Sequence, residues 1–140
     1  MNQPDMAARD ERGGSQTIMV LLIMMSLILV AGLVVDGGRK VAAAERAEAA
    51  AAGAARAGED ASAASRLAGR IDTTAAVLAA RQYLAATPQV SGSVQLLAGG
   101  KLQVTTQSTR PTVYLSAIGM STVTGRGDAV AQLLQSEGSR

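Results

Sequence analysis

The stretch Thr17–Val35 reads TIMVLLIMMSLILVAGLVV and contains no charged side chain. Arg12 precedes it, and Asp36, Arg39 and Lys40 follow it. As a helix that rises about 1.5 Å per residue, this apolar segment extends roughly 28 Å, close to the roughly 30 Å hydrocarbon core of a bilayer. Because a charge inside that core is costly, a charge-free run with charges on both sides is typical of a membrane span. The sequence predicts a transmembrane helix over residues 17–35, with most of the chain on one side.

The apolar segment has two other interpretations. A buried helix of a soluble protein is usually shorter, and this chain has no Phe or Trp to build a core around it. A cleaved secretory signal would use the small residues Val41–Ala44 and release a soluble domain that begins near Ala44. However, the apolar run is long for a signal, and that cut lies beyond Asp36. The transmembrane interpretation is favoured over both alternatives.

Composition restricts the function. Beyond the apolar segment about 105 residues remain, enough for one small domain. The chain has no Cys and no His, which excludes disulfides, thiolate metal sites and the commonest general base. We therefore predict that it is not an enzyme and binds no metal or cofactor. The net charge of +2 comes from scattered residues, which argues against nucleic acid, and nothing indicates a small-molecule substrate.

Charge does not decide the topology of the span. Arg9 and Arg12 lie on its N-terminal side, and Arg39, Lys40 and Arg46 lie on the other. The excess of positive charge that marks a cytoplasmic side is therefore ambiguous here. Either orientation of the chain is compatible with the sequence.

The region that follows the apolar segment is rich in alanine, the residue with the best helix propensity. Residues 1–16 are expected to form a flexible tail, and residues 36–87 a helical region. Gly37–Gly38 weaken a helix by roughly 1 kcal/mol each, so they either form a hinge or lie within one continuous helix. Alanines then recur at alternating spacings of four and three, as in a heptad seam. These candidate helix-packing positions are Ala43, Ala47, Ala50, Ala54, Ala57, Ala61, Ala64 and Ala68. Such a seam lets another helix or a sheet approach closely, and the alternative is a solvated stalk helix.

A second helix is predicted over residues 73–86. Asp72 followed by two threonines is an N-cap signal. The helix is expected to end near Thr87, because the residue before Pro88 disfavours the helical conformation.

Residues 88–127 change to an alternating pattern and predict a small antiparallel β domain. Two strands are expected on either side of Gly99–Gly100, a pair typical of a two-residue hairpin turn. The second strand should end at Arg110–Pro111. The stretch 112–118 is compatible with a short helix or a strand, and a third strand is expected within 120–125. Residues 128–140 are predicted to be a tail or a short helix over 129–135. The predicted fold class is α+β.

The order of these segments resembles the TadE/TadG-like pilus-assembly proteins of high-GC Gram-positive bacteria. The junction Val35–Arg39 (VDGGR) and the stretch Arg110–Val113 (RPTV) carry most of the resemblance. It implies a single-pass, pilin-like subunit or assembly factor of a tight-adherence (Flp) pilus or a related secretion machine. It also implies a cell-membrane location, an outward-facing C-terminal domain, and as partners membrane lipid and other pilus subunits. These partners would be held through the transmembrane and alanine-rich helices.

Many members of that family are cut after a glycine, with a glutamate five residues later. Here the resemblance places the cut between Gly14 and Ser15, and Met19 stands in place of the glutamate. Gly14 is therefore either a cleavage site or a residue of the tail. A secreted or membrane-anchored binding domain unrelated to pili is the alternative function. A membrane-bound enzyme or regulator with a cytosolic domain is a third.

Overall fold

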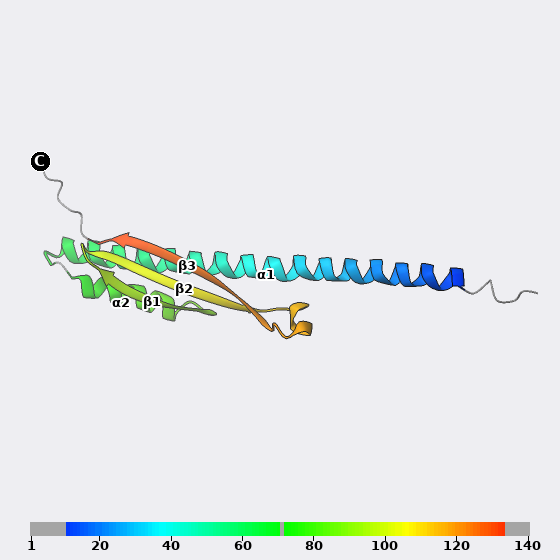
Figure 1. Cartoon of the computed structure of the whole chain (residues 1–140). Coiled ribbons are helices and arrows are strands. Elements are labelled where there is room, and N and C mark those ends of the chain that lie inside the picture. The colour runs from blue at the N-terminus through cyan, green and yellow to red at the C-terminus, as the bar shows by residue number, and fades with distance from the viewer. Residues whose placement is uncertain (1–10, 71, 134–140) are drawn as a thin grey trace, which may run out of the picture.

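The computed structural model describes residues 11–70 and 72–133. In chain order the elements are α1 (Glu11–Leu67), α2 (Thr73–Ala85), β1 (Val90–Leu97), β2 (Lys101–Pro111), the 3₁₀ helix η1 (Leu115–Ile118) and β3 (Thr122–Gln132). The strands form one antiparallel sheet in the order β1-β2-β3. The predicted α+β layout of a long apolar helix, a second helix and a small antiparallel sheet is confirmed (Figure 1).

The apolar segment and the first part of the alanine-rich region belong to one helix. α1 contains 57 residues and is therefore about 85 Å long. Gly37 and Gly38 lie inside it, so the continuous helix is observed and the hinge is not. The helix begins at Glu11, so the expected tail over 1–16 is wrong for residues 11–16. Residues 1–10 lie outside the described part of the chain.

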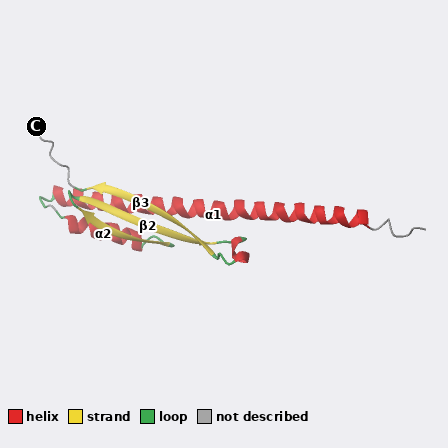
Figure 2. Ribbon diagram, in the orientation of Figure 1, coloured by secondary structure: helices red, strands yellow, loops and turns green. Residues whose placement is uncertain are grey.

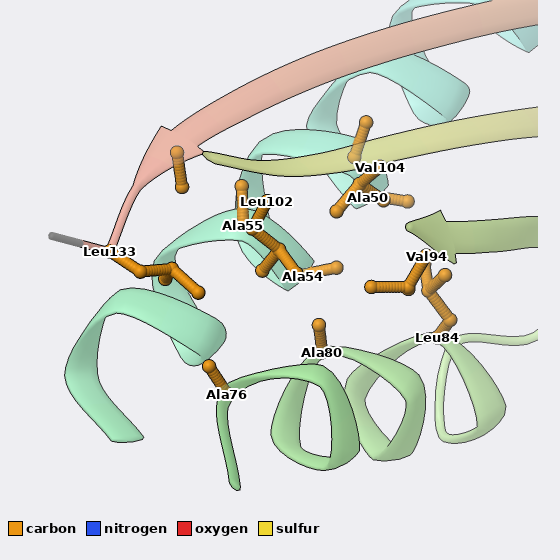
Figure 3. Close-up of a cluster of buried hydrophobic side chains, with 12 residues drawn as sticks. Ala50, Ala54, Ala55, Ala76, Ala80, Leu84, Val94, Leu102, Val104 and Leu133 are labelled. Carbon is orange, nitrogen blue, oxygen red and sulfur yellow. The ribbon is translucent and has the colours of Figure 1, made fainter. Parts of the chain in front are cut away.

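The sheet and α2 pack along the C-terminal half of α1, while most of the N-terminal half of α1 projects beyond them (Figure 2). The Asp72 carboxylate accepts hydrogen bonds from the backbone N–H groups of Thr74 and Ala75, both at 3.0 Å, which confirms the predicted cap of α2. The core lies between α1, α2 and the sheet, and combines alanines of the helices with larger apolar side chains, several of them from the strands (Figure 3). It includes Ala50, Ala54, Ala76, Ala80, Leu84, Val94, Leu102, Val104 and Leu133.

The predicted hairpin is present, with a loop one residue longer than expected. Leu97 pairs with Lys101, which leaves Ala98, Gly99 and Gly100 in the turn. Both glycines have positive φ, 77° and 70°, a conformation that residues with a Cβ rarely adopt. The Gly99–Gly100 pair thus predicts the position of the hairpin correctly, but the turn has three residues instead of the expected two.

The C-terminal part differs most from the prediction. Within 112–118 the structure has η1, which ends at Gly119 with φ of 90°. The third strand runs from Thr122 to Gln132, so the short helix expected over 129–135 is wrong at 129–132. These residues pair with β2, whose N–H and C=O groups satisfy their backbone. The β domain thus extends to residue 132, and residues 134–140 lie outside the described part.

Candidate functional site at the end of the apolar segment

Almost nothing in the fold covers the apolar segment. Large apolar side chains from Ile18 to Val35 are 43–70% exposed. A helix that is apolar on all sides is stable only where its surroundings are apolar. α1 is long and apolar enough to span a membrane. Within the described residues, no core of this chain encloses the apolar segment.

Asp36, the first charged residue after the apolar segment, is 1% exposed and holds a distant loop. Its Oδ1 accepts the N–H of Val113 at 2.8 Å. Its Oδ2 accepts the N–H groups of Tyr114 at 2.9 Å and Leu115 at 2.7 Å. These three N–H groups precede or begin η1 and have no partner within that helix. One carboxylate therefore caps η1 from another element of the fold.

The loop in turn stabilises the charge of Asp36. The Val113 N–H has the largest effect and lowers the pKa of this carboxyl below its ordinary 3.8, partly offset by burial. The N–H groups of Leu115 and Tyr114 and the positive charge of Arg39 lower the pKa further. Since hydrogen bonds to the charged form favour ionisation, Asp36 is a carboxylate at neutral pH.

Two further residues of α1 contact this loop or the residue just before it. Arg39 Nη1 donates a 2.7 Å hydrogen bond to the Pro111 carbonyl. A Cβ placed on Gly32 would lie 2.8 Å from Cβ and Cγ of Tyr114. The Tyr114 side chain therefore packs directly on the backbone of α1 at Gly32. Gly32, Asp36 and Arg39 follow at spacings of four and three and share one face of the helix. We call these three residues the clamp and residues 112–121 the clamped loop.

Sequence reasoning treated Asp36 only as a boundary charge and did not find the clamp. The available signal was the combination of an acid directly after a span with a basic residue three positions later. That signal does not identify the partner, because the bonded loop is 77 to 79 residues away in the chain.

The structure separates the predicted alanine seam into a covered and an uncovered part. Ala43, Ala47, Ala50 and Ala54 are buried against the sheet and α2. Ala57 and Ala61 are half-buried, Ala64 is exposed, and Ala68 is exposed beyond the end of α1. A straight α-helix drifts by about 20° per heptad relative to a strict seven-residue repeat. By the end of α1 the buried face has therefore passed to Gly58 and Ser62.

Two glycines of β3 complete the contact with the covered alanines. A Cβ on Gly125 would overlap the backbone at Ala43 and Ala44, and one on Gly127 would overlap the backbone at Ala47 and Glu48. The strand therefore lies directly on the helix backbone.

A hydrogen bond between layers fixes this approach. Thr106, the register partner of Gly127, donates from Oγ1 to the Ala47 carbonyl at 2.7 Å. Sequence reasoning missed this contact, for which a glycine pair inside a strand is the usual signal.

The candidate cleavage residues Gly14 and Ser15 lie in the first turns of α1 and are exposed. A Cβ on Gly14 would meet nothing within 4 Å. In residues 11–70 and 72–133, no group of three or more acidic side chains is arranged to hold a metal ion.

Comparisons with protein-family models, curated proteins and solved structures give no match to this chain.

Proposed function

We propose that this chain is a single-pass, pilin-like subunit or assembly factor of a tight-adherence (Flp) pilus or a related secretion machine. The observation that carries the proposal is the division of α1. Its first half is exposed and apolar, and its second half is the support on which a small antiparallel sheet is built. Such a subunit can associate with neighbours through its membrane helix while its head projects from the membrane.

The surface around Gly37 and Gly38 supports association through α1. Both glycines are exposed, and a Cβ on either would meet nothing within 4 Å. Each weakens an isolated helix by about 1 kcal/mol relative to alanine. Small residues let neighbouring membrane helices approach closely. We therefore propose that partner subunits contact α1 along the apolar segment and Gly37–Gly38. The buried alanines cannot take part, because the sheet of the same chain covers them.

Purification of the tagged full-length chain from its native membrane tests the proposal. Pilin or pilus-assembly subunits should co-purify with it. The variant Gly38→Leu should lose them without loss of fold, while Leu67→Ala, at an exposed site at the far end of α1, should retain them. If the chain accumulates normally in cells that lack the other pilus proteins and co-purifies with none of them, the proposal is wrong.

The intact mass of the same preparation separates the two forms of the proposal. A mass that lacks residues 1–14 means processing at Gly14–Ser15 and a subunit of the fibre. A full-length mass means a permanently anchored assembly factor.

We further propose that the head faces outward. Because the chain has no cysteine, Ser93→Cys on β1 provides a single exposed thiol. An impermeant maleimide should label it on intact cells and should not label the matched Ser15→Cys. The reverse pattern would support the enzyme or regulator with a cytosolic domain.

The alternative function is a secreted or membrane-anchored binding domain unrelated to pili. Its secreted form predicts a soluble protein that begins near Ala44. The clamp argues against that form, because cleavage at Val41–Ala44 would remove both Asp36 and Arg39. The three N–H groups of the clamped loop would then lose their acceptor.

A further inference from the structure

The clamped loop presents large apolar side chains to its surroundings. Val113 is 47% exposed, Tyr114 45%, Ile118 73% and Met120 54%. The loop contains no charged residue. On a soluble protein, a cluster of this kind beside a second apolar surface is a site of contact with a partner or a membrane.

The clamp fixes the height of this loop along α1. Gly32, under Tyr114, lies within the apolar segment, and Asp36 follows it directly. These two residues are about 6 Å apart along the helix axis. Figure 1 shows η1 beyond the end of the sheet that is nearer to the projecting half of α1. The loop therefore lies level with the last turn of the apolar segment.

That level is the boundary between hydrocarbon and water if α1 spans a bilayer. Aromatic residues such as Tyr concentrate there, and apolar side chains of interfacial segments enter by roughly 5–10 Å. Leu33 and Val34 of α1 lie at the same level along the helix axis as the loop. Their side chains are 66% and 70% exposed. A lipid bilayer would therefore cover both the apolar segment of α1 and the exposed apolar side chains of the clamped loop.

Several backbone N–H groups of the loop have hydrogen-bond acceptors within the protein, as an apolar environment requires. An unpaired N–H in an apolar medium costs several kcal/mol. The Asp36 carboxylate accepts three N–H groups of the loop. Within the loop, Thr112 N–H pairs with the Ser121 carbonyl at 3.0 Å, and Met120 N–H with that of Leu115 at 3.0 Å.

We propose that the clamped loop is a membrane contact, with Val113, Tyr114, Ile118 and Met120 in the interfacial layer of the bilayer that α1 spans. This second contact sets the tilt of the sheet relative to the membrane. The inference rests on α1 as a membrane span and is independent of the pilus proposal.

Single nitroxide labels on the cysteine-free full-length chain in phosphatidylcholine–phosphatidylglycerol nanodiscs test this contact. The variants are Ile118→Cys and Met120→Cys in the loop, Leu22→Cys within the apolar segment, and Leu67→Cys at the far end of α1. Collision with oxygen, which concentrates in lipid, is compared with collision with a water-soluble nickel chelate. We expect Ile118→Cys and Met120→Cys to resemble Leu22→Cys, and Leu67→Cys to be accessible to nickel.

Three results would overturn the inference, and they are distinguishable. Loop labels as accessible to nickel as Leu67→Cys would place the loop in water. Loop labels protected from both reagents would mean that protein covers the loop. A nickel-accessible Leu22→Cys would refute the span itself.

Tyrosine emission gives a second test without a label, because the chain has no Trp and only two Tyr. Tyr83→Phe leaves Tyr114 as the sole emitter, and the matched Tyr114→Phe leaves Tyr83 on α2. In nanodiscs of brominated lipid, Tyr114 should be quenched severalfold more than Tyr83. Equal quenching of the two variants would contradict the membrane contact.

Discussion

At the residue scale, Asp36 connects the apolar segment to the sheet domain. Its carboxylate satisfies three successive N–H groups, and Arg39 adds a bond to the residue that ends β2. A single side chain therefore determines where the chain between β2 and β3 lies relative to α1. This role explains why a charged residue at the end of the apolar segment is buried by protein.

Replacing Asp36 with Asn should release the clamped loop while the rest of the fold persists. The amide retains one acceptor oxygen and directs an NH₂ donor at N–H groups that need acceptors. We expect faster hydrogen exchange at the amides of Val113, Tyr114 and Leu115 and unchanged exchange in α2. Asp60→Asn, an exposed change on the same helix, is the control and should alter neither. Unchanged exchange in Asp36→Asn would contradict the capping role.

The attachment of the loop should also depend on pH in the acid range. The fold lowers the pKa of Asp36 below 3.8, so its contribution to stability is complete above that value. The contribution is lost as pH falls from 3.8 through the lower pKa of the folded chain. An environment-sensitive fluorophore on Ile118→Cys should report this loss as the pH falls below 3.8. The same label in Asp36→Asn should show no such transition, and matching curves would refute the assignment.

At the element scale, the contact between α1 and β3 depends on the absence of side chains on the strand. Gly125 and Gly127 let the strand lie on the helix backbone, and the small alanines beneath leave room for it. The hydrogen bond from Thr106 to the Ala47 carbonyl then crosses between the layers. Close backbone approach thus holds β3 against α1 without a side chain at either glycine.

Gly127→Ala should destabilise the fold by roughly 1–3 kcal/mol, because its methyl group would overlap the helix backbone. Gly37→Ala is the matched change at an open helical position and should stabilise the isolated chain by about 1 kcal/mol. Chemical denaturation of the detergent-solubilised chain, followed by circular dichroism, measures both. The same sign for the two variants would contradict the packing described here.

Elements with a local signal were predictable from the sequence, and contacts between distant elements were not. The apolar segment, the Asp72 cap and the Gly99–Gly100 turn each depend on a few adjacent residues. By contrast, β3 contains two glycines and an aspartate, which disfavour a strand on their own. Pairing with β2 and contact with α1 supply its stability. The clamp was missed for the same reason, because its two halves meet only in the folded chain.

At the scale of the whole molecule, α1 is one helix from the apolar segment to the sheet, without a hinge at Gly37–Gly38. A rigid connection of this kind means that the tilt of the apolar segment and the orientation of the head are coupled. The clamped loop adds a second proposed point of contact with the membrane. A chain held in this way would present the outer face of its sheet in a defined direction relative to the membrane.

We propose above that this chain works in the membrane beside other subunits of a pilus machine. The most direct measurement places a photo-crosslinking amino acid at Val34, an exposed position near Gly37, in cells that carry the complete machine. Mass spectrometry then identifies the crosslinked species. We expect crosslinks to pilin or pilus-assembly subunits, and these crosslinks should be lost when those subunits are deleted. Crosslinks to lipid alone, or to proteins unrelated to pili, would contradict it.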